Sequence, residues 1–287
     1  MLYLCATPIG NLEDVTLRVL EVLARADVVL CEDTRHSQAL FRRHGIVPRA
    51  LLSFHEHNEA ARLERVLSLL REGKVVALVA DAGMPGLSDP GFTLVRACVG
   101  AGEEVVVLPG ASAVTVALVA SGLPSDRFVF AGFLPRGRAK IVAFLEGAGR
   151  AGGSLVAFES PHRLRATLGA IAERWPARRV AVCRELTKLH EQVARGTAAE
   201  VLEILEDRVR GEVVLVLGPD GASSAAGAGA DEEGVGVGET AVRESLRFLL
   251  ERGLRTKEAA SVVARLTGIE SRRAYALAQE EKQGLAP

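Results

Sequence analysis

Three glycine- and proline-rich segments follow predicted strands and have the composition of ligand-binding loops. They are residues 6–12 (ATPIGNL), 81–91 (DAGMPGLSDPG) and 108–113 (LPGASA). Glycine lets the backbone approach a ligand closely, whereas proline stiffens a loop and removes an N–H donor. The segments offer backbone carbonyls and amides but few cations, which suits an adenosine or a sulfonium better than a polyphosphate. The carboxylate of Asp81 can accept a hydrogen bond from a ligand hydroxyl or amine.

The sequence does not indicate the common nucleotide-binding motifs or a metal site. No G-x-G-x-x-G opens a helix after a strand, and no G-x-x-x-x-G-K-[ST] occurs, so a dinucleotide fingerprint and a P-loop are excluded. His55 and His57 flank Glu56 at a spacing that could bind a metal from a strand. A closed metal site normally needs more ligands, and no third one is evident. We therefore expect these histidines to be structural or to contact substrate, and we predict no metal.

Polar and charged residues also gather where other predicted strands end, which is the usual place for site residues. They are residues 32–35 (EDTR), 53–58 (SFHEHN), 158–163 (FESPHR) and 184–188 (RELTK). Each group by itself is compatible with a surface ion pair, the more common case. Together they form a concentrated polar set, which favours a site containing acids, bases and cations.

The elements that must position these residues alternate between strands and helices in the first part of the chain. Apolar runs predict strands at residues 1–6, 28–31, 74–80 and 104–108, and helical patterns predict helices at 17–24, 60–71, 92–100 and 111–121. This rhythm predicts a mostly parallel sheet with helices on both faces. The carboxyl ends of parallel strands share one edge, so the three loops should meet there. One such loop alone would be an ordinary β–α turn, whereas three favour a site.

A second series of elements, a linker and a helical end complete the chain. Strands are predicted at residues 154–158, 179–183 and 212–217, and helices at 163–175 and 198–205. The fold class is therefore α/β, with one domain at residues 1–123 and another at 124–218. Residues 219–238 are rich in Gly, Ala and Ser and predict a flexible linker. Residues 239–287 predict a helical module with the outline of a helix-turn-helix, and a helical cap is equally compatible.

Composition and charge restrict the class of protein. The chain has 287 residues, of which 48% are hydrophobic and 25% are charged, as in a globular protein with a sizeable core. The net charge is −1, so any RNA-binding surface must be a local patch rather than an overall basic field. Four scattered cysteines in apolar surroundings predict reduced, buried thiols. No signal peptide or membrane-spanning apolar stretch is evident, so a cytoplasmic protein is expected.

The motifs, taken in order, resemble those of a known enzyme family. They are TPIGNLEDVTLR (7–18), CEDTR (31–35), LLSFHEHNE (51–59), VADAGMPGLSDPG (79–91), VLPGASAVTVALVASGL (107–123), FAGFLPR (130–136), FESPHRL (158–164) and CRELTKLHE (183–191). This set resembles the bacterial 16S ribosomal RNA cytidine 2′-O-methyltransferases of the tetrapyrrole-methylase superfamily. The family usually has Thr-Pro where this chain has Met84-Pro85, and Pro-Ser where it has Ala111-Ser112. Both departures are compatible with main-chain contacts.

This resemblance implies two α/β domains of the tetrapyrrole-methylase type, with S-adenosyl-L-methionine in the cleft between them, and a homodimer. It implies methyl transfer to the ribose 2′-oxygen of a cytidine in the decoding region of 16S rRNA, in the 30S ribosomal subunit. The cofactor contacts that it implies are Pro8, Asp81, Gly83, Met84, Ser112, Ala113, Phe158, Leu186 and Glu212.

A ribose 2′-hydroxyl is a weak acid, so its methylation needs positioning and help in losing a proton. The candidate bases are Glu32, Asp33, His55, Glu56, Glu159 and Glu185. Glu159 is the first choice because it directly follows an implied donor contact, and the alternative is that it orients Arg163 or Arg184. The predicted contacts with RNA phosphates are Arg35, Arg136, Arg138, Arg163 and Lys188.

Three other functions fit part of this pattern. The chain could methylate a tetrapyrrole, which an assay with a porphyrin-like substrate would reveal. It could methylate a protein side chain, as the diphthine-type relatives do. It could also be a non-catalytic RNA-binding factor in ribosome assembly, which would bind the 30S particle without turning over the methyl donor.

Overall fold

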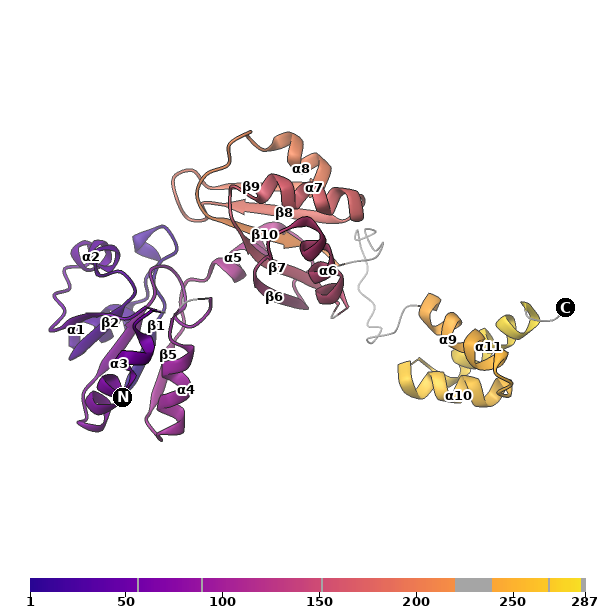
Figure 1. Cartoon of the computed structure of the whole chain (residues 1–287), viewed down its shortest axis with the longest axis horizontal. Coiled ribbons are helices and arrows are strands. Elements are labelled where there is room, and N and C mark those ends of the chain that lie inside the picture. Colours follow the sequence, from indigo (N-terminus) through magenta and orange to yellow (C-terminus); the bar gives the residue numbers. More distant parts are fainter. Residues whose placement is uncertain (56, 89, 151, 220–238, 268, 285–287) are drawn as a thin grey trace. The chain divides into compact units, whose positions relative to one another are not determined.

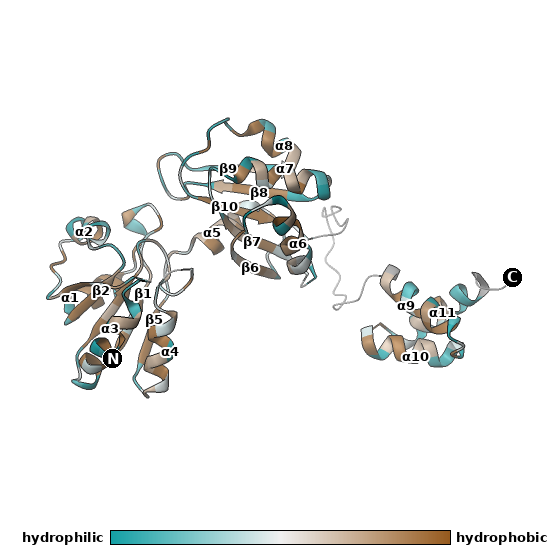
Figure 2. Ribbon diagram, viewed as in Figure 1, coloured by the Kyte–Doolittle hydropathy of each residue, from teal (hydrophilic) through white to brown (hydrophobic). Residues whose placement is uncertain are grey.

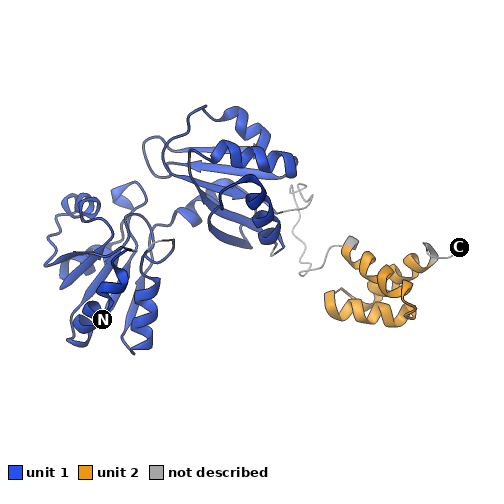
Figure 3. Ribbon diagram, viewed as in Figure 1, with its two compact units in different colours: residues 1–224 blue, residues 225–287 orange. Residues whose placement is uncertain are grey.

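The computed structural model describes residues 1–219, 239–267 and 269–284, apart from residues 56, 89 and 151. The chain divides into two compact units, Met1–Ser224 and Ala225–Pro287 (Figure 3). The first unit contains two sheets, and the second contains three helices. Residues 220–238 of the predicted linker lie outside the described residues.

The first sheet consists of five parallel strands in the order β3-β2-β4-β1-β5 (Figure 1). The strands are β1 (Leu2–Cys5), β2 (Val28–Cys31), β3 (Leu51–Ser53), β4 (Val76–Val79) and β5 (Val105–Leu108). The helices that alternate with them are η1 (Leu12–Asp14, a 3-10 helix), α1 (Leu17–Arg25), α2 (Thr34–Arg43), α3 (Glu59–Arg71) and α4 (Phe92–Gly100). The predicted parallel arrangement is confirmed.

Helices cover both faces of this sheet because its central strands are apolar on both faces. Successive strand residues point to opposite faces. Accordingly, Leu30 packs in one cluster with Leu70 of α3, whereas Val29 packs in another with Leu23 of α1. Figure 2 shows the apolar residues concentrated along the strands of both sheets.

The second sheet is mixed and has the strand order β6-β7-β10-β8-β9. Its strands are β6 (Phe128–Phe133), β7 (Ser154–Glu159), β8 (Arg179–Arg184), β9 (Gln192–Thr197) and β10 (Val213–Leu217), and its helices are α6 (Arg138–Gly149), α7 (Leu164–Arg174) and α8 (Ala198–Ile204). Strands β6 and β7 are parallel, but β10 runs antiparallel to β7 and β8. Val213 pairs with both Glu159 and Arg184, so β10 begins beside the ends of its two neighbours.

Helix α5 (Ala113–Ser121) joins the two sheets and packs on the second one. Its residues Val114, Ala117 and Leu118 share a core cluster with Val214 and Val216 of β10. The helix precedes the predicted domain boundary at residue 123, yet it packs with the strands that follow that boundary. Judged by the packing of the elements, the boundary between the two sheets lies between β5 and α5.

Six elements in the described part of this unit were not predicted from the sequence: η1, α2, β3, β6, α6 and β9. Strand β3 has only three residues, which is too short for a periodic pattern to be recognised. Strand β6 contains an irregular register between Phe130 and Phe133, with Gly132 at φ +62°, so its alternation is broken. Helix α2 is largely polar and buries only Ser37, Leu40 and Phe41.

The second unit consists of α9 (Glu239–Glu251), α10 (Thr256–Thr267) and α11 (Ser271–Gly284). The helical module predicted for the C-terminal residues is therefore present. They have their own apolar core, which includes Leu246 of α9, Val263 of α10 and Leu277 of α11. None of the helices in the described ranges combines the length and the apolar character that a membrane span requires.

Candidate active site

The three glycine- and proline-rich loops meet at one edge of the first sheet, as the sequence predicts. Thr7 and Gly83 exchange two backbone hydrogen bonds of 2.9 and 3.0 Å, and the Thr7 hydroxyl donates to the carbonyl of Ala80 at 3.0 Å. A Cβ atom on Gly110 would lie 2.7 Å from the Cβ atom of Ala6, so the loop after β5 needs glycine to approach the loop after β1. Backbone pairing thus fixes these loops relative to one another.

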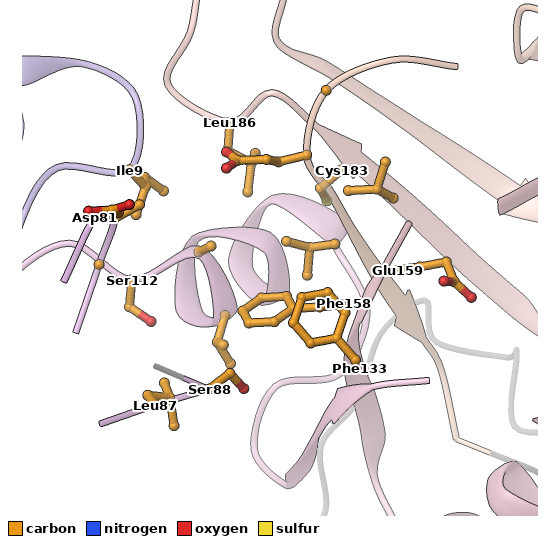
Figure 4. A pocket seen from close by; sticks show the side chains of 18 of the residues that line it. Ile9, Asp81, Leu87, Ser88, Ser112, Phe133, Phe158, Glu159, Cys183 and Leu186 are labelled. Atoms are coloured by element: carbon orange, nitrogen blue, oxygen red, sulfur yellow. The ribbon is translucent and has the colours of Figure 1, made fainter. Parts of the chain in front are cut away.

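A cavity of about 340 Å³ opens beside these loops (Figure 4). One side comes from the loops and the start of α5, and the other comes from the second sheet. Its lining residues are Ile9, Asp81, Ala82, Gly83, Met84, Leu87, Ser88, Ser112, Ala113, Val114, Phe133, Phe158, Glu159, Ser160, Pro161, Cys183, Leu186, Gly211, Glu212, Val213 and Val214. Most of the lining is apolar, and it contains carboxylates but no lysine or arginine.

The cavity brings together most of the predicted cofactor contacts. Eight of them line it: Asp81, Gly83, Met84, Ser112, Ala113, Phe158, Leu186 and Glu212. The ninth, Pro8, instead lines a smaller adjoining cavity of about 180 Å³. The antiparallel direction of β10 places Glu212 here, because the residue before that strand lies next to the ends of β7 and β8.

Several lining residues were not singled out from the sequence. Phe133 packs edge-to-face on Phe158, with ring centroids 5.4 Å apart. It belongs to the FAGFLPR motif, which was the available signal. Ile9, Leu87 and Cys183 also lie in motifs of the set, but their side chains were not singled out, because an apolar residue that lines a cavity looks the same in sequence as one that lies in the core.

Asp81 and Asp33 connect the ends of β4 and β2. The backbone N–H of Asp33 donates to Oδ1 of Asp81 at 3.1 Å. The Asp33 carboxylate caps α2 and accepts from the Arg35 guanidinium at 2.9 and 3.2 Å, and from the Arg35 backbone N–H at 2.8 Å. These hydrogen bonds lower the pKa of Asp33 to about 2. Such a weakly basic carboxylate is poorly suited to proton removal, and the contact of this residue with Asp81 is made by its backbone.

A charged cluster in the loop after β8 adjoins the cavity through its member Glu212. The Lys188 ammonium donates to Glu185 at 2.9 Å and to Glu212 at 2.8 Å, and the Glu212 backbone N–H donates to Glu185 at 2.9 Å. The hydrogen bond from Lys188, followed by that from the Glu212 backbone, lowers the pKa of Glu185. Glu185 and Thr187 have φ values of +51° and +64°, a strained region for residues with a Cβ atom.

Glu159, the first-choice base, is held by three partners in the protein. Its carboxylate accepts from the Ser160 backbone N–H and the Thr167 hydroxyl, each at 2.6 Å, and pairs with Arg163 at 2.5 Å. The side chain is fully buried, and Figure 4 shows its carboxylate directed away from Asp81 and Ser112. Arg163 in turn donates to the carbonyls of Leu134 and Pro135. These contacts are those of the alternative role, in which Glu159 orients Arg163.

His55 follows β3 and lines neither cavity. Its Nε2 atom lies 2.9 Å from the side-chain nitrogen of Asn58, while its buried Nδ1 atom makes no hydrogen bond to a described residue. Glu32 directly follows β2, and Glu56 lies outside the described residues. The cavity therefore contains most of the predicted cofactor contacts but, among the described candidate bases, only Glu159.

The predicted RNA contacts lie near strand ends, and most have protein partners. Arg35 is 88% exposed beside Asp33, and Arg136 is exposed. Arg138 pairs with Glu173 on α7. Arg163 and Lys188 belong to the networks around Glu159 and Glu185. The Arg163 guanidinium and the Lys188 ammonium therefore already hold loops of the site in place.

Cys183 of β8 lines the cavity with a buried thiol. Burial raises the pKa of this thiol from 9.0 to about 11, so at neutral pH it stays protonated and is a poor nucleophile. Between these two pKa values the unfolded chain loses the proton while the folded chain keeps it. The contribution of Cys183 to stability is therefore complete below the lower pKa and is lost as the pH rises through the upper one.

We accordingly expect a steeper alkaline loss of stability in the wild type than in Cys183→Ala. In urea titrations across the window set by these two pKa values, the slopes should differ by up to about 1.4 kcal/mol per pH unit, the effect of one proton. The substitution also removes packing, which lowers stability at every pH but leaves the difference in slope. Parallel slopes for the two proteins would contradict this assignment.

Comparisons with known proteins give the family of the chain. Residues 1–202 match the family Tetrapyrrole (Corrin/Porphyrin) Methylases. Ribosomal RNA small subunit methyltransferase I from Halalkalibacterium halodurans is 39% identical over 98% of this chain and 95% of the relative. The protein of the same name from Thermotoga maritima is 45% identical over 75% of this chain and 97% of the relative. Among solved structures, uroporphyrin-III C-methyltransferase from Thermus thermophilus, complexed with S-adenyl homocysteine, covers 76% of this chain and 96% of its own, with a TM-score of 0.53 and 21% identity.

The solved structure shares the fold over 76% of this chain. The similarity in sequence is more specific, because it extends over nearly the whole length of both chains. The chain therefore belongs to the ribosomal RNA small subunit methyltransferase I family of the tetrapyrrole methylases.

Proposed function

We propose that the chain transfers the methyl group of S-adenosylmethionine to the ribosomal RNA of the small subunit, at the ribose 2′-oxygen of a cytidine in the decoding region. The observation that carries this proposal is the membership of the family, with 39% identity over 98% of the chain. The methylase fold and the cavity beside the three loops provide a place for the donor. When bound, S-adenosylmethionine supplies an electrophilic methyl group.

The residues of the larger cavity fit this donor. Phe158, Leu186 and Ile9 offer apolar surface for an adenine ring and a thioether chain, and the Asp81 carboxylate can accept from hydroxyl or ammonium groups. The lining contains carboxylates and no lysine or arginine, which favours a sulfonium cation over a phosphate. Gly83, at φ +80°, keeps the loop after β4 free of a side chain where it faces the cavity.

For the acceptor, we propose that exposed cations near the strand ends contact RNA phosphates, chiefly Arg35 and Arg136. The net charge of −1 is compatible with a local surface that recognises an assembled 30S subunit. Losing either cation should reduce the salt dependence of binding, because fewer counterions are then released. Such an enzyme would act in the cytoplasm, where ribosomal subunits are assembled.

We also propose that the chain forms a homodimer. Val107 of β5 and Val119 of α5 are large apolar side chains that are 55% and 76% exposed. In this proposal, the two side chains are covered by the partner subunit. Light scattering coupled to gel filtration tests the proposal, and a monomeric mass at micromolar concentration would contradict it.

The reaction is tested with purified protein, radiolabelled S-adenosylmethionine and 30S subunits from a strain that lacks the enzyme. A single alkali-resistant labelled site in the decoding region is expected, because a 2′-O-methyl group blocks alkaline cleavage of the following phosphodiester. Donor binding without labelling of 30S subunits would instead favour a tetrapyrrole or protein substrate. No donor binding would favour a non-catalytic RNA-binding factor.

A chain that ends at Pro219 is expected to bind S-adenosylmethionine as tightly as the full chain. All residues that line the two cavities precede residue 215, and almost the whole Thermotoga maritima relative is matched by 75% of this chain. The three C-terminal helices have a separate core, so their removal leaves the cavity walls complete. Isothermal titration calorimetry gives the two Kd values. A loss of about tenfold or more, roughly 1.4 kcal/mol, would assign the C-terminal unit a part in donor binding.

A further inference from the structure

The second, smaller cavity adjoins the first and has a different character. It has a volume of about 180 Å³ and shares Ile9, Asp81, Ala82 and Glu212 with the larger cavity. Its remaining wall is formed mainly by the loop after β1 and by α2, including His36, Ser37 and Leu40. Because the two cavities have four lining residues in common, a group in one would lie directly beside a ligand in the other.

Ser37 is the residue that points to a ligand in this cavity. It is 6% exposed, and its hydroxyl makes no hydrogen bond to any described residue. Burial raises the pKa of the Cys31 thiol and the Ser37 side chain lowers it, so a thiol, which is only a weak hydrogen-bonding group, lies beside the hydroxyl. An unsatisfied buried hydroxyl costs about 1–3 kcal/mol. The hydroxyl oxygen is covered by protein atoms, so a rotation of the Ser37 side chain would bring it to a ligand hydroxyl in the cavity as its partner.

The rest of the lining fits the same kind of ligand. His36 lies in the first turn of α2, where its imidazole can donate or accept a hydrogen bond. Leu12 and Leu40 supply apolar surface for the flat side of a sugar or a base. The cavity is smaller than the ~300–1,000 Å³ of most pockets for drug-sized ligands. It therefore suits a single sugar or nucleoside and is too small for a macrocycle of four pyrroles.

We propose that this second cavity is the acceptor subsite, which receives the ribose of one unstacked RNA nucleotide and holds its hydroxyl beside the donor cavity. This inference rests on the proposed function. Enzymes that modify a single nucleotide commonly take it out of the stack into a pocket of its own, and selectivity then comes from the walls of that pocket. His36 and Ser37 contact the ribose hydroxyls in this arrangement. Arg35, exposed on the preceding position of α2, is placed to meet the adjoining phosphate.

The test compares His36→Ala and Ser37→Ala with Gln38→Ala, a matched control at an exposed position of the same helix that lines neither cavity. Three quantities are measured for each: the Kd for S-adenosylmethionine, the kcat and KM for methylation of unmodified 30S subunits, and the Tm. Each hydrogen bond is worth ~0.5–1.5 kcal/mol, so kcat/KM should fall about two- to tenfold in each cavity variant. The donor Kd should stay at the wild-type value in each variant. The Tm should be unchanged in His36→Ala and unchanged or higher in Ser37→Ala, which removes the unsatisfied hydroxyl, and Gln38→Ala should match the wild type throughout.

Ser37→Val adds a second, independent measurement, because it fills the cavity instead of deleting a contact. It should lower kcat/KM for 30S subunits further than Ser37→Ala, again with an unchanged donor Kd. Weaker donor binding in the His36 or Ser37 variants would overturn the proposal, since the cavity would then hold part of the donor. Unchanged kcat/KM in all the variants would overturn it as well. If the wild type itself does not methylate 30S subunits but binds the donor, it is the proposed function that fails.

Discussion

Replacing Gly10 by alanine is expected to weaken the binding of S-adenosylmethionine by at least about tenfold and to destabilise the first unit by roughly 1–3 kcal/mol, the usual effect of an overpacked contact. A Cβ atom at residue 10 would lie 2.5 Å from Cγ of Lys188, 2.7 Å from the Thr187 hydroxyl and 2.8 Å from the carbonyl oxygen of Leu186. The Lys188 side chain can move, but the backbone at Leu186 cannot do so without moving the cavity wall.

The loop after β8 is poorly able to adjust, because it is already strained and tied at several points. Thr187 has a φ value of +64°, and its hydroxyl accepts from the Asn11 backbone N–H at 3.0 Å. Its own backbone N–H donates to Glu191 at 2.6 Å. Displacing this loop would move Leu186 and the Glu185–Lys188–Glu212 cluster together. Donor affinity measured by calorimetry and the Tm should therefore fall in parallel.

Gly169→Ala is the matched control. Gly169 lies within α7, and a Cβ atom there would meet no heavy atom within 4 Å. Alanine in a helix is more favourable than glycine by roughly 0.5–1 kcal/mol, so this variant should be slightly stabilised and should bind the donor normally. Normal donor affinity in Gly10→Ala would mean that the loop after β1 does not support the donor site through the loop after β8.

Replacing Glu159 by glutamine is expected to cost roughly 3–5 kcal/mol of stability, because it leaves Arg163 without its partner in a buried network. An amide also places N–H donors where the Ser160 N–H, the Thr167 hydroxyl and the Arg163 guanidinium all donate. For a chain of this size, the corresponding fall in Tm is roughly 6–20 °C. Urea titration and thermal unfolding measure both quantities.

The same variant separates the two roles considered for Glu159. If Glu159 orients Arg163, the single-turnover rate of the donor-saturated protein, measured well below the Tm, should fall less than about tenfold. A general base typically contributes ~10²–10⁴ to the rate. Loss of that size with an unchanged Tm would restore Glu159 as the base. Thr167→Val is the companion variant: it removes one partner of the carboxylate without touching its charge, and it should lower the Tm with little effect on the rate.

The sequence by itself determined the parallel sheet and the three loops at its edge, because both depend on local patterns. Apolar runs of strand length, separated by helices with a periodic apolar face, specify strands buried on both faces. Glycine and proline at the strand ends indicate loops from the local sequence alone, whatever the loops contact in the folded protein. Eight of the nine residues predicted as cofactor contacts line one cavity, because the motifs that contain them lie at the ends of strands.

Only the tertiary structure decided which groups face one another across the site. The antiparallel direction of β10 places Glu212 beside the ends of β7 and β8, and strand direction is set by pairing between distant segments. The burial of Glu159 depends on Thr167 and Arg163 of the following helix and turn.

The second cavity is a further product of packing between distant segments. The loop after β1 lies against α2, a largely polar helix that no periodic pattern predicted. The Ser37 hydroxyl is buried there beside the Cys31 thiol, without a hydrogen bond to an oxygen or nitrogen atom of the described residues. The apolar periodicity of a segment shows only which of its faces packs on the core. It does not show which side chains remain available to contact a ligand.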